Sequence, residues 1–313
     1  MNEFDLIERY FTRPVHSAVL GVGDDAALLQ VSEGMVLAVS TDMLVCGTHF
    51  FADADPFFLG HKTLAVNLSD MAAMGAVPRW ATLALSLPDA DEAWLERFSA
   101  GFLAMADMHG VELVGGDTTR GPLNLSVTIM GEVEASLALR RSGAKAGDEI
   151  WVSGILGDAA LALAHLEGRI VLAEDEFAAC APALHRPVPR VALGQALLGI
   201  ATSAIDISDG LLADLGHILA ASNVGAELDF GSLPVSAVMQ KYLGEGIAKR
   251  CVLAGGDDYE LCFTAPVSRH ADVLAIGMKL TRIGSIVAGQ GCTVRDEAGN
   301  NIVPESAGYD HFG

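Results

Sequence analysis

Basic side chains are scarce in this sequence. Its 313 residues include 19 lysines and arginines against 40 aspartates and glutamates, which gives a formal net charge of −21 at pH 7. No run rich in lysine and arginine interrupts this acidic composition. Because a chain of such charge repels polyanions, we expect neither nucleic acid nor a membrane surface among its partners.

Paired cysteines and a secretion signal are also missing. The five cysteines are odd in number and form no C-x-x-C pair, which indicates reduced thiols and no zinc site. The first residues include Glu3, Asp5 and Glu8, which do not fit the basic-then-apolar pattern of a signal peptide. We therefore expect a cytoplasmic protein.

Long apolar runs are absent, although hydrophobic residues make up 51% of the chain and the mean hydropathy is +0.39. The longest tract without a charge, Val191–Ile205, is shorter than the roughly 20 residues that a bilayer-spanning helix needs. The length allows two domains of about 150 residues each. We expect a soluble protein with two domains.

Several catalytic signatures do not occur. The sequence contains no G-x-x-x-x-G-K-[ST] loop, no G-x-S-x-G elbow and no H-E-x-x-H motif, which excludes the enzyme classes that depend on them. The stretch "GVGDDA", residues 21–26, formally matches the dinucleotide fingerprint G-x-G-x-x-A. Its two adjacent aspartates would repel a pyrophosphate, so we do not interpret it as a Rossmann loop.

The sequence does contain a repeated pattern, in which an apolar run ends in glycine or serine and aspartate follows. Short apolar runs predict buried strands, so the pattern predicts aspartates at strand ends, where α/β proteins bind ligands. A single aspartate in such a position is more typical of a helix cap or a turn. The aspartates in question are Asp24, Asp25, Asp42, Asp70, Asp117, Asp206, Asp209, Asp257 and Asp258.

The recurrence of this pattern favours a metal site. Two like charges about 4 Å apart repel by roughly 4 kcal/mol at an effective dielectric constant near 20, so converging carboxylates must take up protons or bind cations. Nearby hydroxyls would complete an oxygen-only ligand set that suits Mg²⁺, an ion that often bridges carboxylates to nucleotide phosphates. The stretch "LVGGDTTRG", residues 113–121, would then hold phosphate through a metal bound by Asp117. The hydroxyls are those of Ser40, Thr41, Thr118, Thr119 and Ser208.

One of the few basic clusters contains Arg140, Arg141 and Lys145, and Arg120 lies in the 113–121 stretch. An arginine beside a metal–phosphate site would bind an oxyanion through two hydrogen bonds. A solvated connector between domains would have the same composition. The residues alone leave both interpretations open.

The spacing of apolar residues predicts a mixed α/β fold. In the first half we expect an N-terminal helix, two strands within 18–50, helices at 56–75 and 91–109, and two strands within 111–134. Trp94, Phe98 and Phe102 stand at helical spacing, which predicts core positions. In the second half we expect helices at 157–167, 176–184, 188–200 and 210–222, and strands near 150, 205, 227, 252, 261 and 285.

Taken in order, the motifs resemble those of the thiamine-monophosphate kinase family, within the superfamily of aminoimidazole ribonucleotide synthetase. The resemblance runs from about residue 3 to residue 312 without large gaps. Single motifs are unspecific, but the ordered set is highly specific. The motifs are "GVGDDAALL", "STDMLVCGTHF", "KTLAVNLSDMAAMGAVP", "GGDTTRGP", "RSGAKAGD", "IDISDGLLADLGHI", "GGDDYELCF" and "GYDHF".

The resemblance implies ATP-dependent phosphorylation of thiamine monophosphate to thiamine diphosphate, with several Mg²⁺ ions. It implies an aminoimidazole-ribonucleotide-synthetase-like fold, in which residues 1–138 form a metal- and ATP-binding domain that dimerises and residues 139–313 form an α/β domain. The expected assembly is a homodimer. No general base is expected, because the acceptor phosphate is already mostly ionised at pH 7.

The resemblance also assigns residues, by motif match. Those implied to bind the metals are Asp25, Ser40, Thr41, Asp42, Asp70, Asp117, Asp206 and Asp209. Those implied to bind ATP are Gly116, Asp117, Arg141 and Ser208, and those implied to contact thiamine monophosphate are His49, Asp257 and Tyr309. At Asp257 the chain departs from the family, which usually has glutamate there.

Two other functions stay open on the sequence. One is another ATP-dependent activity of the same superfamily on a different small acceptor. The other is a protein that binds Mg²⁺ or nucleotide without catalysis. A panel of acceptors with ATP and Mg²⁺ distinguishes them.

Overall fold

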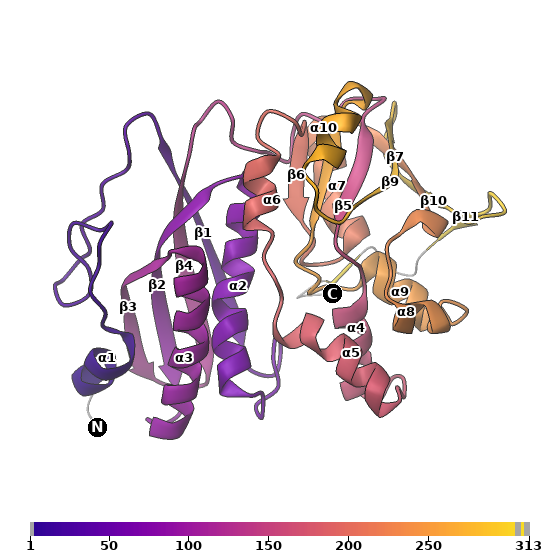
Figure 1. The fold of residues 1–313 in the computed structure, drawn as a ribbon. Helices are drawn as coiled ribbons and strands as arrows, with labels where there is room; N and C mark the ends of the chain where they lie inside the picture. The colour runs from indigo at the N-terminus through magenta and orange to yellow at the C-terminus, as the bar shows by residue number, and fades with distance from the viewer. Residues whose placement is uncertain (1–2, 304–307, 310–313) are drawn as a thin grey trace. The chain divides into compact units, whose positions relative to one another are not determined.

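Residues 3–303 and residues 308 and 309 are described by the structure, a computed structural model. The chain divides into two units (Figure 1). The first contains Met1–Met71 and Ala76–Ser136, and the second contains Ala72–Gly75 and Leu137–Gly313. The last crossing between the units thus falls two residues before the predicted boundary at 138. The roles assigned to the two parts stay predictions.

A four-stranded sheet lies at the centre of the first unit, in the order β1-β4-β2-β3. β4 pairs antiparallel with β1 and β2, whereas β2 and β3 run parallel. The helices α2 and α3 cover one face of this sheet (Figure 1). The elements are α1 (Glu3–Phe11), β1 (Val36–Val45), α2 (Pro56–Met74), β2 (Val77–Leu87), α3 (Glu92–His109), β3 (Glu112–Arg120) and β4 (Asn124–Val133).

Helix α3 shows how the local sequence defines the elements of this unit. It begins after Asp91, whose carboxylate accepts hydrogen bonds from the N–H groups of Ala93 and Trp94. It ends at Gly110, which adopts a left-handed conformation with φ 65°. Phe98 and Phe102 are fully buried on its inner face, as predicted, and the ring of Trp94 stacks on Phe98.

Two predictions for the first unit were wrong. Residues 18–50 contain one strand of the sheet, β1, because the segment before it forms only isolated bridges such as that between Leu20 and Leu28. Strand β2 was not predicted. Its signal was the alternation of Leu83, Leu85 and Leu87, each buried, with more exposed residues between them.

A seven-stranded mixed sheet organises the second unit, in the order β11-β10-β7-β9-β5-β8-β6. Its strands are β5 (Glu149–Ser153), β6 (Ser203–Asp206), β7 (Gly225–Asp229), β8 (Leu261–Ala265), β9 (Leu280–Val287), β10 (Gly291–Arg295) and β11 (Asn301–Ile302). Its helices are α4 (Asp158–Leu166), α5 (Glu174–His185), α6 (Val191–Ala196), α7 (Leu211–Ser222), α8 (Ala237–Tyr242), α9 (Gly246–Ala254) and α10 (His270–Ala275), with short 3₁₀ turns η1 (Phe230–Ser232) and η2 (Val267–Arg269). The predicted mixed α/β class is confirmed.

The strand predicted near residue 252 is a helix, α9. The run Cys251–Ala254 is buried, and a short apolar run in the sequence does not distinguish a buried strand from a buried helix. The predicted helix 188–200 is shorter, since α6 covers only Val191–Ala196. Strands β10 and β11 and helices α8 and α10 were not predicted.

Two further features of the described chain concern its longer helices and its cysteines. No described helix is both long and apolar enough to cross a membrane. All five cysteines are free. Burial raises the pKa of the Cys180 thiol to about 12 and that of Cys251 to about 11, so both stay protonated at neutral pH.

Candidate functional site

The segment between α1 and β1 carries the predicted metal ligand Asp25 and is anchored near both ends by the sheet. The carboxylate of Glu112 accepts hydrogen bonds from the N–H groups of His16, Ser17 and Ala18, at 2.6, 2.8 and 2.9 Å. Burial alone would raise the pKa of Glu112, but these hydrogen bonds lower it.

At the other end of the segment, the carboxylate of Glu132 accepts from the N–H of Ser32 at 2.6 Å and from Arg79 Nε at 3.0 Å. Burial opposes ionisation of Glu132, yet these donors lower its pKa. The 16–32 segment is therefore held by two charged carboxylates of the sheet.

This segment forms one wall of a cavity of about 590 Å³ in the first unit. Three predicted site residues, Asp25, Gly116 and Asp117, line the same cavity. Its lining also includes apolar side chains of α1 and of the sheet. These side chains are Phe4, Ile7, Phe11, Leu83, Leu85, Leu113 and Val114.

Gly116 allows β3 to lie close to β2 beside this cavity. Its φ is 152°, a conformation that L side chains rarely adopt. A Cβ atom at this position would lie 1.9 Å from the carbonyl oxygen of Leu83. Any side chain at residue 116 would push the two strands apart.

Ser40, Asp42 and Asp70 meet where β1 lies under α2. Ser40 Oγ donates to Asp70 Oδ2 at 2.5 Å, and the N–H of Asp42 donates to Asn67 Oδ1 at 3.2 Å. The prediction that these aspartates lie at strand ends was wrong, because Asp42 lies within β1 and Asp70 within α2. The structure nevertheless groups their oxygens on one side of β1.

Thr41 does not join this group through its side chain. Neighbouring residues of a strand point to opposite faces, and the Thr41 hydroxyl lies 2.8 Å from the hydroxyl of Thr128 on the face away from Ser40. The Thr41 hydroxyl thus lies on the opposite face of β1 from Ser40 and Asp42, and its role as a metal ligand stays a prediction.

The strand register separates Asp42 from Asp117. Asp42 lies on β1 and Asp117 on β3, the two edge strands, with β4 and β2 between them. Three strand spacings correspond to roughly 14 Å of backbone separation. Among the residues that the structure describes, no group of three or more His, Cys, Asp or Glu side chains could hold a metal ion. Asp42 and Asp117 are therefore too far apart for their carboxylates to contact one ion together.

His49 follows β1 in a tight turn. Its Nδ1 accepts a hydrogen bond from the N–H of Val45 at 2.9 Å, while its own N–H donates to the Val45 carbonyl at 2.9 Å. In the neutral ring the proton is therefore on Nε2. The turn fixes the orientation of the imidazole.

In the second unit, the chain after β6 pairs with the chain before β8. The N–H of Asp257 donates to the Ser208 carbonyl at 2.9 Å, and the N–H of Tyr259 donates to the Ile207 carbonyl at 2.8 Å. Asp206 is the last residue of β6. The pairing thus brings together the predicted residues Asp206, Ser208 and Asp257.

Tyr309 joins the same group. Its N–H donates to the Asp209 carbonyl at 3.0 Å, and a Cβ atom on Gly308 would lie 2.8 Å from that oxygen. Tyr309 is half exposed. The other residues of the terminal motif, Asp310, His311 and Phe312, lie outside the described residues.

Asp257 and Tyr259 both adopt left-handed backbone conformations, with φ 70° and 48°. Such conformations are uncommon for residues other than glycine and concentrate at functional sites. The hydroxyl of Tyr259 donates to Asp257 Oδ1 at 3.0 Å, which orients the carboxylate. Asp257 follows helix α9, so the predicted position at the end of a strand was wrong for this aspartate too.

Arg141 lies exposed on a loop that Ser222 holds in place. The hydroxyl of Ser222 accepts from the N–H groups of Gly143 and Ala144 at 3.1 and 3.2 Å and donates to the Arg141 carbonyl at 3.3 Å. The main chain from the Arg141 carbonyl to Ala144 is therefore anchored to the end of α7.

The sequence did not single out two buried acids close to these residues. Asp214, on α7, accepts from three successive N–H groups, those of residues 208–210, and burial raises its pKa to about 7. Glu260 accepts from Arg190 Nε at 2.6 Å and from Ser153 Oγ at 2.5 Å. For Asp214 the available signal was a charge within an otherwise apolar stretch, whereas Glu260 follows two other acids and gave no such signal.

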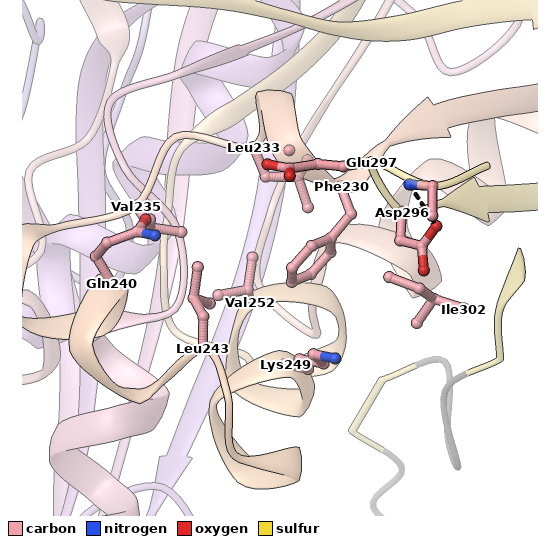
Figure 2. Close-up of a pocket in the computed structure, with 12 residues that line it drawn as sticks. Phe230, Leu233, Val235, Gln240, Leu243, Lys249, Val252, Asp296, Glu297 and Ile302 are labelled. Atoms are coloured by element: carbon pink, nitrogen blue, oxygen red, sulfur yellow. Dashed lines mark hydrogen bonds between the residues drawn. The ribbon is translucent and has the colours of Figure 1, made fainter. Parts of the chain in front are cut away.

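A second cavity, of about 380 Å³, lies in the second unit away from the predicted residues (Figure 2). Phe230, Leu233 and Val252 form part of its apolar wall, and Lys249 and Asp296 stand at its edge. None of the predicted site residues lines it.

Comparison with known proteins identifies the family. Residues 23–133 match the family described as AIR synthase related protein, N-terminal domain. The chain is 50% identical to the thiamine-monophosphate kinase of Salmonella typhimurium over 321 residues, which cover 99% of this chain and 98% of that one. The chain belongs to the thiamine-monophosphate kinase family.

Solved structures of the kinase family agree with the fold. The crystal structure of thiamine-monophosphate kinase from Stenotrophomonas maltophilia K279a superposes with a TM-score of 0.84 at 50% identity, covering 93% of this chain and 94% of that one. The structure of AaThiL complexed with AMPPCP and TMP gives a TM-score of 0.80 at 31% identity, covering 99% and 96%. The predicted family and fold are confirmed, whereas the residue roles stay predictions.

Proposed function

We propose that this chain transfers the γ-phosphoryl group of ATP to thiamine monophosphate and releases thiamine diphosphate and ADP. The observation that supports this assignment is the 50% sequence identity to a thiamine-monophosphate kinase, in an alignment that covers 99% of this chain. The chain is accordingly a phosphotransferase with ATP as its co-substrate. The finer points that follow, namely the residues, the metal, the course of the transfer and the assembly, are proposals.

ATP would bind at the cavity of about 590 Å³ in the first unit. Gly116 and Asp117 lie on its wall, and Gly116 carries no side chain to block the approach of phosphates. The apolar side chains of α1 offer a surface for a flat ring, while the polar residues lie beside Asp25. Arg141 and Ser208, which belong to the second unit, stay proposed contacts of ATP, and an arginine can bind a phosphate through two hydrogen bonds.

The donor atoms present fit Mg²⁺. Ser40, Asp42 and Asp70 offer only oxygen, as do Asp25 and Asp117, and Mg²⁺ prefers oxygen ligands from one or two carboxylates together with phosphates and waters. Because β1 and β3 are opposite edge strands, we propose that these residues bind more than one ion. Asp206 and Asp209 would supply further carboxylates. Mg²⁺ bound to these residues would shield the repulsion between the two phosphate-bearing substrates.

Thiamine monophosphate would be held by His49, Asp257 and Tyr309. Asp257 is oriented by the hydroxyl of Tyr259, and its carboxylate can face the cationic thiazolium ring. An aromatic side chain such as Tyr309 also attracts a cation through its ring face. His49 Nε2 carries a proton that can be donated to a phosphate oxygen.

The chain needs no general base for this reaction. The acceptor is a phosphate monoester with a second pKa near 6, so its oxygen is mostly ionised at pH 7. The proposed binding residues would instead position the acceptor oxygen in line with the γ-phosphate and exclude water. We propose direct transfer without a phosphorylated enzyme.

We further propose that two copies of the chain associate through β1. This strand lies at the edge of its sheet, and its outward residues Leu37, Val39 and Met43 are 40, 56 and 57% exposed. Adjacent apolar side chains on an edge strand are rarely left in water. A second copy can present the same strand, which gives a symmetric interface.

The assignment is tested by measuring ADP and thiamine diphosphate in a reaction with ATP, Mg²⁺ and thiamine monophosphate. Equal amounts of the two products are expected. Parallel reactions with thiamine, with other phosphate monoesters and without an acceptor serve as controls. ADP formation with another acceptor and none with thiamine monophosphate would assign a different activity, and no ADP in any reaction would exclude catalysis.

A further inference from the structure

The loop at residues 208–210 is where the predicted residues of the second unit meet. Ser208 and Asp209 lie in it, the N–H of Asp257 donates to the Ser208 carbonyl, and the N–H of Tyr309 donates to the Asp209 carbonyl. The backbone of this loop thus connects residues proposed for ATP and metal with residues proposed for the acceptor.

One side chain holds the other side of the same loop. Oδ2 of Asp214 accepts hydrogen bonds from the N–H groups of Ser208, Asp209 and Gly210, at 3.0, 3.0 and 3.1 Å. Asp214 lies in the first turn of α7 and is only 3% exposed. Three consecutive N–H groups that converge on one oxygen form an anion-binding concavity, here filled by the protein's own carboxylate.

The main chain of Ser208 and Asp209 is consequently fixed from two directions. Their two N–H groups donate to Asp214. Their two carbonyl oxygens accept hydrogen bonds from the N–H groups of Asp257 and Tyr309. A rotation of either peptide unit would break a bond on both sides at once. The position of the Asp257 backbone therefore depends on the carboxylate behind the loop.

We propose that Asp214 is a positioning residue, which fixes the 208–210 loop so that the acceptor-binding and the metal- and ATP-binding side chains keep their relative placement. It acts through the backbone and touches neither substrate. This inference rests on the proposed function for its kinetic consequence, whereas its structural consequence can be measured without any substrate.

The test compares Asp214→Ala, which removes the acceptor, with Asp214→Asn, whose amide oxygen can still accept the three N–H groups. Asp296→Ala is the matched control. Asp296 also accepts backbone N–H groups, those of Ala298 and Asn300 at 3.0 and 2.8 Å, but its loop contains no predicted site residue.

We expect Asp214→Ala to lower kcat/KM about 10- to 100-fold, the usual effect of losing a residue that holds ligands in place. The KM for thiamine monophosphate should rise several-fold, because Asp257 is displaced. Asp214→Asn should retain activity within about tenfold, and Asp296→Ala should leave both constants near those of the unaltered chain. Simple loss of folded protein lowers the apparent kcat and leaves KM unchanged, so an unchanged KM in Asp214→Ala would overturn the proposal.

Hydrogen–deuterium exchange without substrates gives the second readout. Amides of residues 208–210 should exchange faster in Asp214→Ala than in the unaltered chain and stay protected in Asp214→Asn. Unaltered exchange in the alanine variant would overturn the proposal whatever the reaction. If the unaltered chain does not phosphorylate thiamine monophosphate, the proposed function fails, and exchange still decides whether Asp214 holds the loop.

Discussion

The hydroxyl of Ser40 donates to Oδ2 of Asp70 at 2.5 Å, and this hydrogen bond joins the middle of β1 to the inside of α2. Both residues belong to regular elements, so neither side chain is carried by a loop that can move away. A site built on a strand and a helix is positioned more accurately than one built on loops.

Asp70→Asn and Asp117→Asn should each abolish turnover and leave the fold intact. Asparagine has the same shape but no charge, so a direct Mg²⁺ ligand is lost without a change of volume. The loss in kcat should exceed about 100-fold, because mutation of a residue that only supports a metal ligand already lowers activity 10- to 100-fold. The measurement is steady-state kinetics at saturating Mg²⁺, with circular dichroism to check the fold.

Asp107→Asn is the control for these two variants. Asp107 lies exposed on α3 and pairs with Arg13, away from every predicted site residue. Its activity should match that of the unaltered chain. Near-normal turnover of both Asp70→Asn and Asp117→Asn at saturating Mg²⁺ would exclude them as ligands.

Phosphoryl transfer should proceed with inversion at the γ-phosphorus. A single in-line displacement inverts the configuration, whereas two successive displacements through a phosphorylated enzyme restore it. ATP made chiral at the γ-phosphorus with oxygen isotopes, followed by analysis of the thiamine diphosphate, measures the outcome. Net retention would establish a covalent intermediate and contradict direct transfer.

Asp257→Ala should raise the KM for thiamine monophosphate several-fold and leave the KM for ATP almost unchanged. The carboxylate is oriented by Tyr259 and is proposed to face only the acceptor. Asp257→Glu should be tolerated, since the family usually has glutamate at this position. Steady-state kinetics with each substrate varied in turn decides the matter.

The alternative outcomes for Asp257 are informative. Unchanged KM and kcat for thiamine monophosphate in the alanine variant would remove Asp257 from the site. An effect confined to ATP would mean that its loop belongs to the other ligand. Aspartate stops roughly 1.5 Å short of a glutamate, so a bridging water can complete its contact.

Val39→Glu on the exposed face of β1 should convert a dimer into a monomer. Two copies of the charge would be buried face to face in a symmetric interface, and buried like charges without partners cost several kcal/mol. Val171→Glu is the matched control, because Val171 is 83% exposed in the segment between α4 and α5. Sedimentation velocity gives the masses, and a monomeric unaltered chain would refute the interface.

The stability contributed by Glu176 should disappear in acid. Hydrogen bonds from Lys241 and Tyr242 lower the pKa of Glu176 from its ordinary value of 4.5 to about 2. A pKa that is lower in the folded state gives stability that is present above about pH 4.5 and is lost as the pH falls toward 2. Glu176→Gln removes this contribution at every pH.

Urea unfolding of the unaltered chain and of Glu176→Gln therefore measures the effect. The difference in free energy of unfolding between the two should be constant from pH 7 to about 5 and should shrink below pH 4.5. Glu174→Gln controls for the loss of one negative charge in the same turn of α5. If this difference in free energy of unfolding grew as the pH fell, the predicted direction of the pH dependence would be wrong.

The sequence was a good guide where a pattern depends on neighbouring residues. Helix α3 has a capping aspartate, buried aromatics at helical spacing and a terminal glycine, and each signal is local. The metal and substrate residues were assigned from short motifs in a fixed order. The structure then placed Asp25, Gly116 and Asp117 around one cavity, although they are separated by about 90 residues.

The sequence was a poor guide where the outcome depends on long-range contacts. Two sequence patterns disagreed at Asp70, because the apolar run before it suggested a strand end whereas the spacing over residues 56–75 predicted a helix, and Asp70 lies in helix α2. The distance between Asp42 and Asp117 depends on the strand order β1-β4-β2-β3. Asp214 holds the loop just before its own helix, but its proposed role depends on Asp257 and Tyr309, which pair with that loop from distant parts of the sequence.

Two carboxylates anchor the ends of the segment before β1, so the ends are fixed whereas the number of residues between them can vary. Glu112 holds residues 16–18 and Glu132 holds Ser32, so the sheet fixes both ends and not the path between them. Because the entropy of closing a loop rises by only about 0.6 kcal/mol for each doubling of its length, insertions in this stretch would cost little. Residues 29–31, which follow the Leu20–Leu28 bridge and lie outside the cavity lining, are therefore a place where the chain could be lengthened, for a tag or a reporter, without shifting the register of β1.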